Sequence, residues 1–176
     1  TEQFFKDVIW GELDFLILDL PPGTGDVQLT LSQKIPLDGA IIVTTPNDIA
    51  LTDVRKGADM FNKVKTPLLG VVENMSYMEI AGKLKTSSIK PSDIELQLDS
   101  KVIPLNEDLS FKHKFHLFKQ GGGLNESKRL DIPLLAEIPY SEDLMLSIDK
   151  GEPLVFADEN HPISEIFTQI ANSLKD

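Results

Sequence analysis

Four short apolar runs, separated by segments with helical spacing, constrain the fold of this chain more than any other feature. Each run is apolar on both faces, which is typical of a strand buried inside a parallel sheet. The runs are Leu13–Leu20, Gly39–Thr45, Pro67–Glu73 and Ile132–Ile138. Apolar residues that recur every three or four positions predict helices at Ala50–Lys65 and His161–Leu174. A short helix is expected at Val27–Lys34, and Ser141 as an N-cap followed by acidic residues predicts another at Ser141–Asp149. Strands that alternate with helices predict a doubly wound, mostly parallel α/β sheet.

Residues 79–117 interrupt this alternation with a long polar stretch. Within it, Ile94–Leu98 alternates like a half-exposed strand, and Ser100–Leu105 is able to pair with that strand across Asp99. We expect a β-rich insertion inside one domain that spans residues 1–176, rather than a second domain.

The charge and cysteine content exclude several classes of function. The 176 residues include 28 acidic and 17 basic side chains, so the net charge of -11 argues against binding nucleic acid or an anionic membrane through bulk charge. A nucleotide remains compatible with this charge, because backbone N–H groups can bind phosphate. The absence of cysteine removes disulfides, thiolate catalysis and any cysteine-ligated cluster held by this chain. No apolar run is long enough to span a membrane, and we expect a cytoplasmic protein.

Ligands bind beyond the carboxyl ends of the strands in an open α/β sheet, and the first predicted strand ends in an unusual string. Asp19 closes the strand, and Pro21 to Asp26 follow it. An acidic residue at this place is how nucleotide hydrolases hold the magnesium of ATP, usually through water. The string Pro22, Gly23, Thr24 and Gly25 lets backbone N–H groups approach a phosphate closely. The alternative is a turn in which Asp19 caps the next helix, but the whole string at a strand end favours the nucleotide hypothesis.

Two further strand ends carry candidate ligand contacts. Asn74 follows the third run, and its amide offers a donor and an acceptor that suit the edge of an adenine ring. Pro139 and Tyr140 end the last run beside the same expected crevice. An ordinary turn explains Asn74 when it is taken alone, and a helix-start turn explains Pro139 equally well.

Other motifs carry weaker signals. His113 and His116 have no acidic or cysteine companions nearby in the sequence, so we interpret them as solvated residues rather than metal ligands. The run Gly121–Gly123 resembles a phosphate loop, but no Lys-Ser or Lys-Thr pair follows it. We expect it to be a flexible return from the insertion.

Taken together, these strings resemble the Mrp/ApbC family of iron–sulfur cluster carrier ATPases, which belong to the MinD/ParA-like deviant P-loop NTPases. The resemblance covers nearly the whole chain outside residues 79–115, and the combination of PPGTGD with ENMSY is highly specific. The matching segments are Asp14–Thr30, Ile42–Pro46, Asp53–Gly57, Gly70–Tyr77, Phe118–Gly123 and Ile138–Pro139.

The resemblance implies a role for each candidate residue. It makes the strand that ends at Asp19 the Walker B strand, with Asp19 as the catalytic and magnesium-binding residue. It makes Pro21–Asp26 the switch that senses the γ-phosphate of ATP. It also implies that Asn74 contacts adenine and that Pro139 and Tyr140 flank the base. The implied protein is a homodimer that binds ATP and Mg²⁺ and delivers clusters to iron–sulfur apoproteins or assembly factors.

Two features depart from the family pattern. The Gly-rich Walker A loop is absent, so we expect this chain to be the C-terminal portion of a larger P-loop domain and to lack ATPase activity alone. Many family members have a Cys-x-x-Cys just after the ENMSY string, whereas this chain has Met78–Gly82 there. The chain therefore supplies no iron–sulfur ligand.

Two other hypotheses remain open at this point. One is a positioning ATPase like MinD, although such proteins usually end in a basic amphipathic helix, and the tail Ile163–Asp176 has Lys175 as its one basic residue. The other is a non-catalytic module whose insertion recruits a partner.

Overall fold

The centre of the molecule is a four-stranded sheet built around one long strand, β2 (Leu68–Lys83). The computed structural model describes residues 7–20, 26–85, 90, 93–98 and 100–175. Strands β1 (Ala40–Thr44) and β6 (Leu134–Tyr140) run parallel to β2 on its two sides, and β5 (Ser110–Phe115) pairs antiparallel with its far half. The parallel strands and their helical connections confirm the predicted α/β class.

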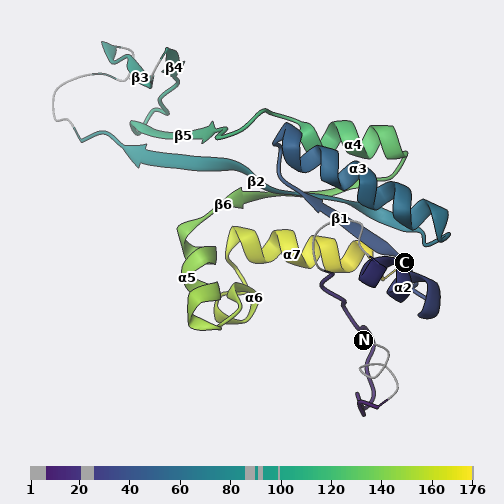
Figure 1. The fold of residues 1–176 in the computed structure, drawn as a ribbon. Coiled ribbons are helices and arrows are strands. Elements are labelled where there is room, and N and C mark those ends of the chain that lie inside the picture. The colour runs from purple at the N-terminus through teal and green to yellow at the C-terminus, as the bar shows by residue number, and fades with distance from the viewer. Residues whose placement is uncertain (1–6, 21–25, 86–89, 91–92, 99, 176) are drawn as a thin grey trace.

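Helices cover both faces of this sheet (Figure 1). Helices α3 and α4 contact each other and the sheet on one side, and α7 packs against β6 on the other. Short polar side chains begin several of these helices: Asn47 accepts a hydrogen bond from the Ile49 N–H, and Ser141 accepts one from the Leu144 N–H. The described helices are α2 (Asp26–Lys34), α3 (Asp48–Lys63), α4 (Gly122–Leu130), α5 (Glu142–Lys150), α6 (Leu154–Ala157) and α7 (Pro162–Ser173).

The main apolar core lies between the sheet and α3. It joins Ile42 of β1 and Val71 of β2 to three buried residues of the helix, Ala58, Met60 and Phe61. Val71 and Ala58 have no exposed surface at all. Because these residues come from both strands and the helix between them, this core sets the geometry of the strand ends that follow it.

The prediction of a buried first strand is wrong for the described structure. Residues 13–20 form no strand, and Leu13, Phe15 and Ile17 are 51%, 58% and 89% exposed. An apolar run becomes a strand only when a neighbour provides its ladder hydrogen bonds, and no described strand pairs with this segment. Its end is anchored, because Leu20 packs against the core.

The Gly121–Gly123 run also differs from expectation. It begins helix α4 rather than forming a flexible return: Gly121 lies outside the helix with φ +77°, and Gly122 and Gly123 are buried in its first turn. The local pattern does not predict this helix, because residues 125–129 in its middle are all polar.

The expected hairpin inside the insertion is confirmed. Strands β3 (Leu96–Leu98) and β4 (Lys101–Ile103) pair antiparallel. They are carried by β2 and β5, which extend together away from the body of the molecule (Figure 1). Ion pairs between Lys83 and Asp108 at 2.9 Å, and between Lys112 and Glu79 at 3.0 Å, lie along this ribbon. We call β2 beyond Tyr77, the β3–β4 hairpin and β5 the excursion.

Ile42→Ala tests the core. Truncating this 6% exposed side chain removes packing between β1 and α3, so we expect the free energy of unfolding to fall by about 3 kcal/mol. Ile49→Ala is the matched control, because Ile49 is 77% exposed and its loss should cost less than about 0.5 kcal/mol. Urea denaturation of both variants makes the comparison, and equal losses would contradict this description of the core.

Candidate nucleotide site

The carboxyl ends of β1 and β6 lie on either side of residues 73–78 of β2, which continues beyond them to Lys83. Thr44, which ends β1, pairs with Glu73 of β2, and the next residue of β2, Asn74, pairs with Ile138 of β6. This is the edge at which ligands bind in open α/β sheets. Asn74 on β2 and Pro139 and Tyr140 on β6 are the predicted ligand contacts, and they therefore lie on neighbouring strands at that edge.

A bulge in β2 brings three of the predicted residues together. Asn74 pairs with Ile138 and Met78 pairs with Tyr140, so residues 75–77 of β2 face Pro139 alone. Proline has no N–H to contribute to the ladder, which suits a position opposite a bulge. Asn74, Pro139 and Tyr140 are thus adjacent in the structure although about 65 residues separate them in sequence.

The Asn74 side chain is half-buried, and its Oδ1 accepts a hydrogen bond from the Met75 N–H at 2.9 Å. This bond belongs to the local turn, in which Met75 has φ +52°. The oxygen keeps a second lone pair and the amide keeps its donors, so an additional ligand contact is chemically available. Pro139 is half-buried and Tyr140 is 43% exposed, which leaves both able to contact a ligand.

Asp19 is exposed and forms no ion pair or side-chain hydrogen bond with another described residue. Its neighbour Leu20 packs on the core, which anchors the segment near the body of the sheet. Pro22, Gly23, Thr24 and Gly25 lie outside the described residues. The structure therefore brings the predicted base contacts together, and it leaves the predicted phosphate and magnesium contacts untested.

Sequence analysis missed Glu73, whose carboxylate lies at the centre of this edge. The side chain is 1% exposed; one oxygen accepts a hydrogen bond from the Ser76 hydroxyl at 2.6 Å and the other from the Gly123 N–H. One signal in the sequence could have identified Glu73: it is an acidic residue at the end of a fully apolar run. Such a residue is buried with its strand, so its carboxylate needs hydrogen-bond partners.

The same carboxylate explains why the Gly121–Gly123 run is not a phosphate loop. It takes the place at the N-terminus of α4 where an anion would bind. The glycines are needed for close approach: a β-carbon at residue 123 would lie 2.8 Å from the Glu73 β-carbon, and one at residue 122 would lie 3.0 Å from the Pro46 α-carbon. Helix α4 therefore contacts the ends of β1 and β2 through backbone.

A second buried carboxylate, Glu126, anchors the middle of α4. It is 1% exposed and binds Arg55 of α3 at 2.5 Å and Arg129 at 2.6 Å. Burial raises the pKa of the Glu126 carboxyl, but the hydrogen bonds and charges of Arg55 and Arg129 outweigh it and hold that pKa below its ordinary value. The ion pair between Arg55 and Glu126 fixes α4 on α3. It thereby also fixes the position of the Gly123 N–H, which binds Glu73.

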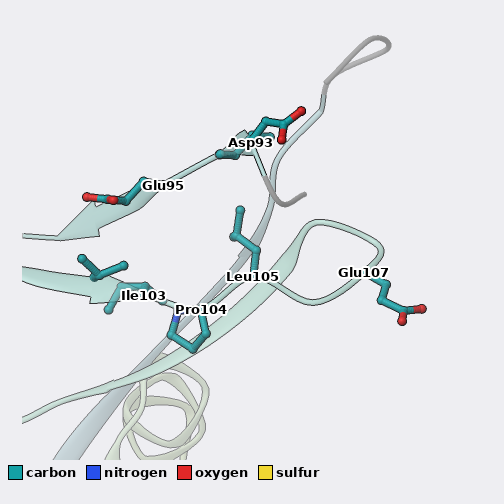
Figure 2. A pocket seen from close by; sticks show the side chains of 8 residues that line it. Asp93, Glu95, Ile103, Pro104, Leu105 and Glu107 are labelled. Carbon is teal, nitrogen blue, oxygen red and sulfur yellow. The ribbon is translucent and has the colours of Figure 1, made fainter. Parts of the chain in front are cut away.

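The excursion carries a groove of about 560 Å³ that is separate from the strand ends. Figure 2 shows Ile103, Pro104 and Leu105 at this groove, with the carboxylates of Asp93, Glu95 and Glu107 around it.

The two histidines are not as solvated as expected. His113 and His116 are half-buried, and His116 Nδ1 lies 3.2 Å from the Ser76 carbonyl oxygen. Throughout the described part of the chain, no group of three or more His, Cys, Asp or Glu side chains is placed to hold a metal ion. The described helices likewise include none long and apolar enough to cross a membrane.

Glu126→Gln tests the anchor of α4 and has a defined pH dependence. We expect it to lower the free energy of unfolding by about 2 kcal/mol near neutral pH, because a charge-assisted network is lost. The folded-state pKa of Glu126 lies below its ordinary value of 4.5, so this stabilisation is present above that value and disappears as the pH falls through the folded-state pKa.

Urea denaturation at a series of pH values makes this measurement. The difference between the wild type and Glu126→Gln should shrink as the solution becomes more acidic than about pH 4. Glu152→Gln, at an exposed position, is the control and should change stability by less than about 0.5 kcal/mol. If the difference in the free energy of unfolding stayed constant with pH, the stabilisation would not come from the ion pairs of Glu126.

Comparisons with known proteins agree with this architecture. The ParA family model described as NUBPL iron-transfer P-loop NTPase matches residues 1–102 and 105–175. An iron-sulfur cluster carrier protein of Pseudomonas fragi is 38% identical over 169 residues, which cover 96% of this chain and 49% of that protein. The iron-sulfur cluster transfer protein NUBPL of Mus musculus is 36% identical over 173 residues, which cover 98% of this chain and 46% of that protein.

A solved structure supports the same assignment. The nucleotide-binding protein from Archaeoglobus fulgidus, in complex with ADP, is 33% identical with a TM-score of 0.59, and the match covers 85% of this chain and 50% of that chain. This chain spans about half the length of the curated relatives named above. Because the family model matches almost every residue, the chain belongs to the NUBPL family of iron-transfer P-loop NTPases.

Proposed function

We propose that this chain is the part of an ATP-dependent iron–sulfur cluster carrier that contacts the adenine base and senses the γ-phosphate. The observation that carries the proposal is the bulge in β2, which places Asn74 beside Pro139 and Tyr140, next to the carboxyl ends of β1 and β6. Two relatives are named as iron-sulfur cluster carrier or transfer proteins, and a solved relative is in complex with ADP.

The residues at this edge fit an adenine ring. Asn74 has an amide donor and a free acceptor lone pair for the polar edge of the base, and Pro139 and Tyr140 have apolar surfaces for its faces. Asp19 fits Mg²⁺ that is bound through water, because its carboxylate is exposed and is paired with no other described residue. Pro21–Asp26 would then report the presence of the γ-phosphate.

The phosphates themselves need groups that the described residues do not supply. The N-terminus of α4 is already bound to Glu73, and the sequence has no Walker A loop. The relatives are about twice as long as this chain, and we infer that the additional part of the whole protein supplies that loop. Additional strands and helices would also cover the exposed run at residues 13–17 and the face of β1 on which Val43 is 61% exposed.

The cluster is the cargo of the proposed reaction. This chain has no cysteine, so its residues do not fit an iron–sulfur cluster, and we assign the cluster ligands to the rest of the protein. Hydrolysis in the complete protein, a homodimeric assembly, transfer to iron–sulfur apoproteins and a cytoplasmic location are parts of the same proposal.

Asp19→Asn in the complete protein tests the catalytic assignment. Removing the charge that holds Mg²⁺ should lower the rate of ATP hydrolysis by about a hundredfold or more, with an unchanged melting temperature. Asp14→Asn is the matched control, because Asp14 is exposed on the same segment. Turnover that is unchanged in Asp19→Asn, measured by phosphate release, would refute the Walker B assignment.

The groove on the excursion supports a second function, which is compatible with the first: recognition of the protein that receives the cluster. The groove is lined by the apolar side chains of Ile103, Pro104 and Leu105 and by the acidic residues Glu95 and Glu107, which suits a polypeptide segment with apolar and basic residues (Figure 2).

A shortened excursion tests this second function. Lys83 pairs with Ser110, so an Asn-Gly turn in place of residues 84–109 should close the ribbon without disturbing the sheet. We expect ATP hydrolysis to stay within about twofold of wild type while cluster delivery to an apoprotein slows. Delivery at the wild-type rate would exclude the excursion from recognition.

A further inference from the structure

Both oxygens of the buried Glu73 carboxylate accept hydrogen bonds from groups that carry no charge. The donors are the Ser76 hydroxyl, at 2.6 Å, and the Gly123 N–H. Among the described residues, no ion pair includes Glu73. Burial of an ionised carboxylate is costly unless its oxygens are bound, so these two contacts hold the side chain in one position.

The contact with Ser76 joins the residue that precedes Asn74 to the middle of the bulge of β2. Glu73 and Ser76 enclose Asn74 and Met75, and Met75 has a backbone conformation that non-glycine residues seldom adopt. A bulge is an alternative to a regular ladder, and a shift of register by one residue moves every following side chain to the opposite face of a sheet. The conformation that presents Asn74 beside Pro139 therefore needs a contact that holds the bulge residues against the strand that precedes them.

We propose that Glu73 is a positioning residue that acts with Ser76 to hold Asn74 in place for the adenine base. The inference rests on the proposed function, because it assumes that Asn74 contacts adenine. The bond from the Gly123 N–H fixes the other carboxylate oxygen, so α4 orients Glu73 and Glu73 orients the bulge. Glu73 would thereby contribute to recognition of the base without contacting it.

A purely structural role would weaken binding of every ligand alike, whereas a positioning role affects only ligands that carry a base. Two probes separate these effects: ATP, and inorganic tripolyphosphate, which carries the phosphates alone. Their dissociation constants would be measured by calorimetry on the complete protein. Asn74→Ala establishes how much the base contact contributes.

Ser76→Ala is the principal variant. We expect it to raise the dissociation constant of ATP about tenfold, the effect of one lost charge-assisted hydrogen bond, and to leave tripolyphosphate within about twofold. Ser127→Ala is the matched control: Ser127 is also buried, and its hydroxyl donates to the Ile132 carbonyl at 2.8 Å, away from the bulge. Ser127→Ala should leave the ratio of the dissociation constants of ATP and tripolyphosphate unchanged.

Glu73→Gln provides the conservative comparison. A glutamine can accept from the Gly123 N–H and donate to the Ser76 oxygen, so it should keep a ratio near that of wild type. If Ser76→Ala does not fold, Ser76→Cys replaces it with a weaker donor of similar size and carries the same expectation.

The outcomes distinguish this inference from the proposed function. If Asn74→Ala weakens ATP alone but Ser76→Ala leaves the ratio unchanged, the positioning role is refuted and the base contact stands. Equal weakening of both probes by Ser76→Ala also refutes positioning, because it indicates general loss of structure. If Asn74→Ala changes neither probe, or the wild type does not bind ATP, the proposed base contact fails and the inference fails with it.

Discussion

The contact between the Glu73 carboxylate and the first turn of α4 determines how the candidate site is built. A carboxylate that is 1% exposed must have its oxygens bound, and the Gly123 N–H and the Ser76 hydroxyl supply those bonds. The helix N-terminus is a favourable place for a negative charge. One side chain therefore joins the end of β2, its bulge and helix α4, and small residues at 122 and 123 make the approach sterically possible.

Glu126, one turn after Gly123 in α4, also supports this arrangement. Its two arginine partners bind it to α3 and to α4 itself, so the position of α4 depends on two buried carboxylates with different partners. Glu73 is bound by neutral donors and Glu126 by cations. Removing the partners of either would leave buried carboxyl oxygens without hydrogen-bond partners, which makes both positions sensitive to substitution.

Much of the fold could be predicted from local pattern. The alternation of apolar runs and helical segments indicated β1, β6, α3, α5 and α7, and the alternation at residues 94–105 indicated the β3–β4 hairpin. Pro139 and Asn74 were recognised because they follow buried runs, where an α/β sheet binds ligands. The same local pattern could not show that β2 continues to Lys83, because that extension depends on β5, which lies 27 residues further along the chain.

By itself, the sequence determined the α/β class, the strand ends that carry the candidate site and the absence of any cysteine ligand. These properties depend on the order and type of neighbouring residues. Tertiary structure decided that the run at residues 13–20 remains without a strand partner in the described chain, that Gly121–Gly123 starts a helix, and that Glu73 is the centre of the site. The ladder bonds of a strand and the Gly123 N–H that binds Glu73 come from residues distant in sequence, so a local pattern cannot predict these contacts.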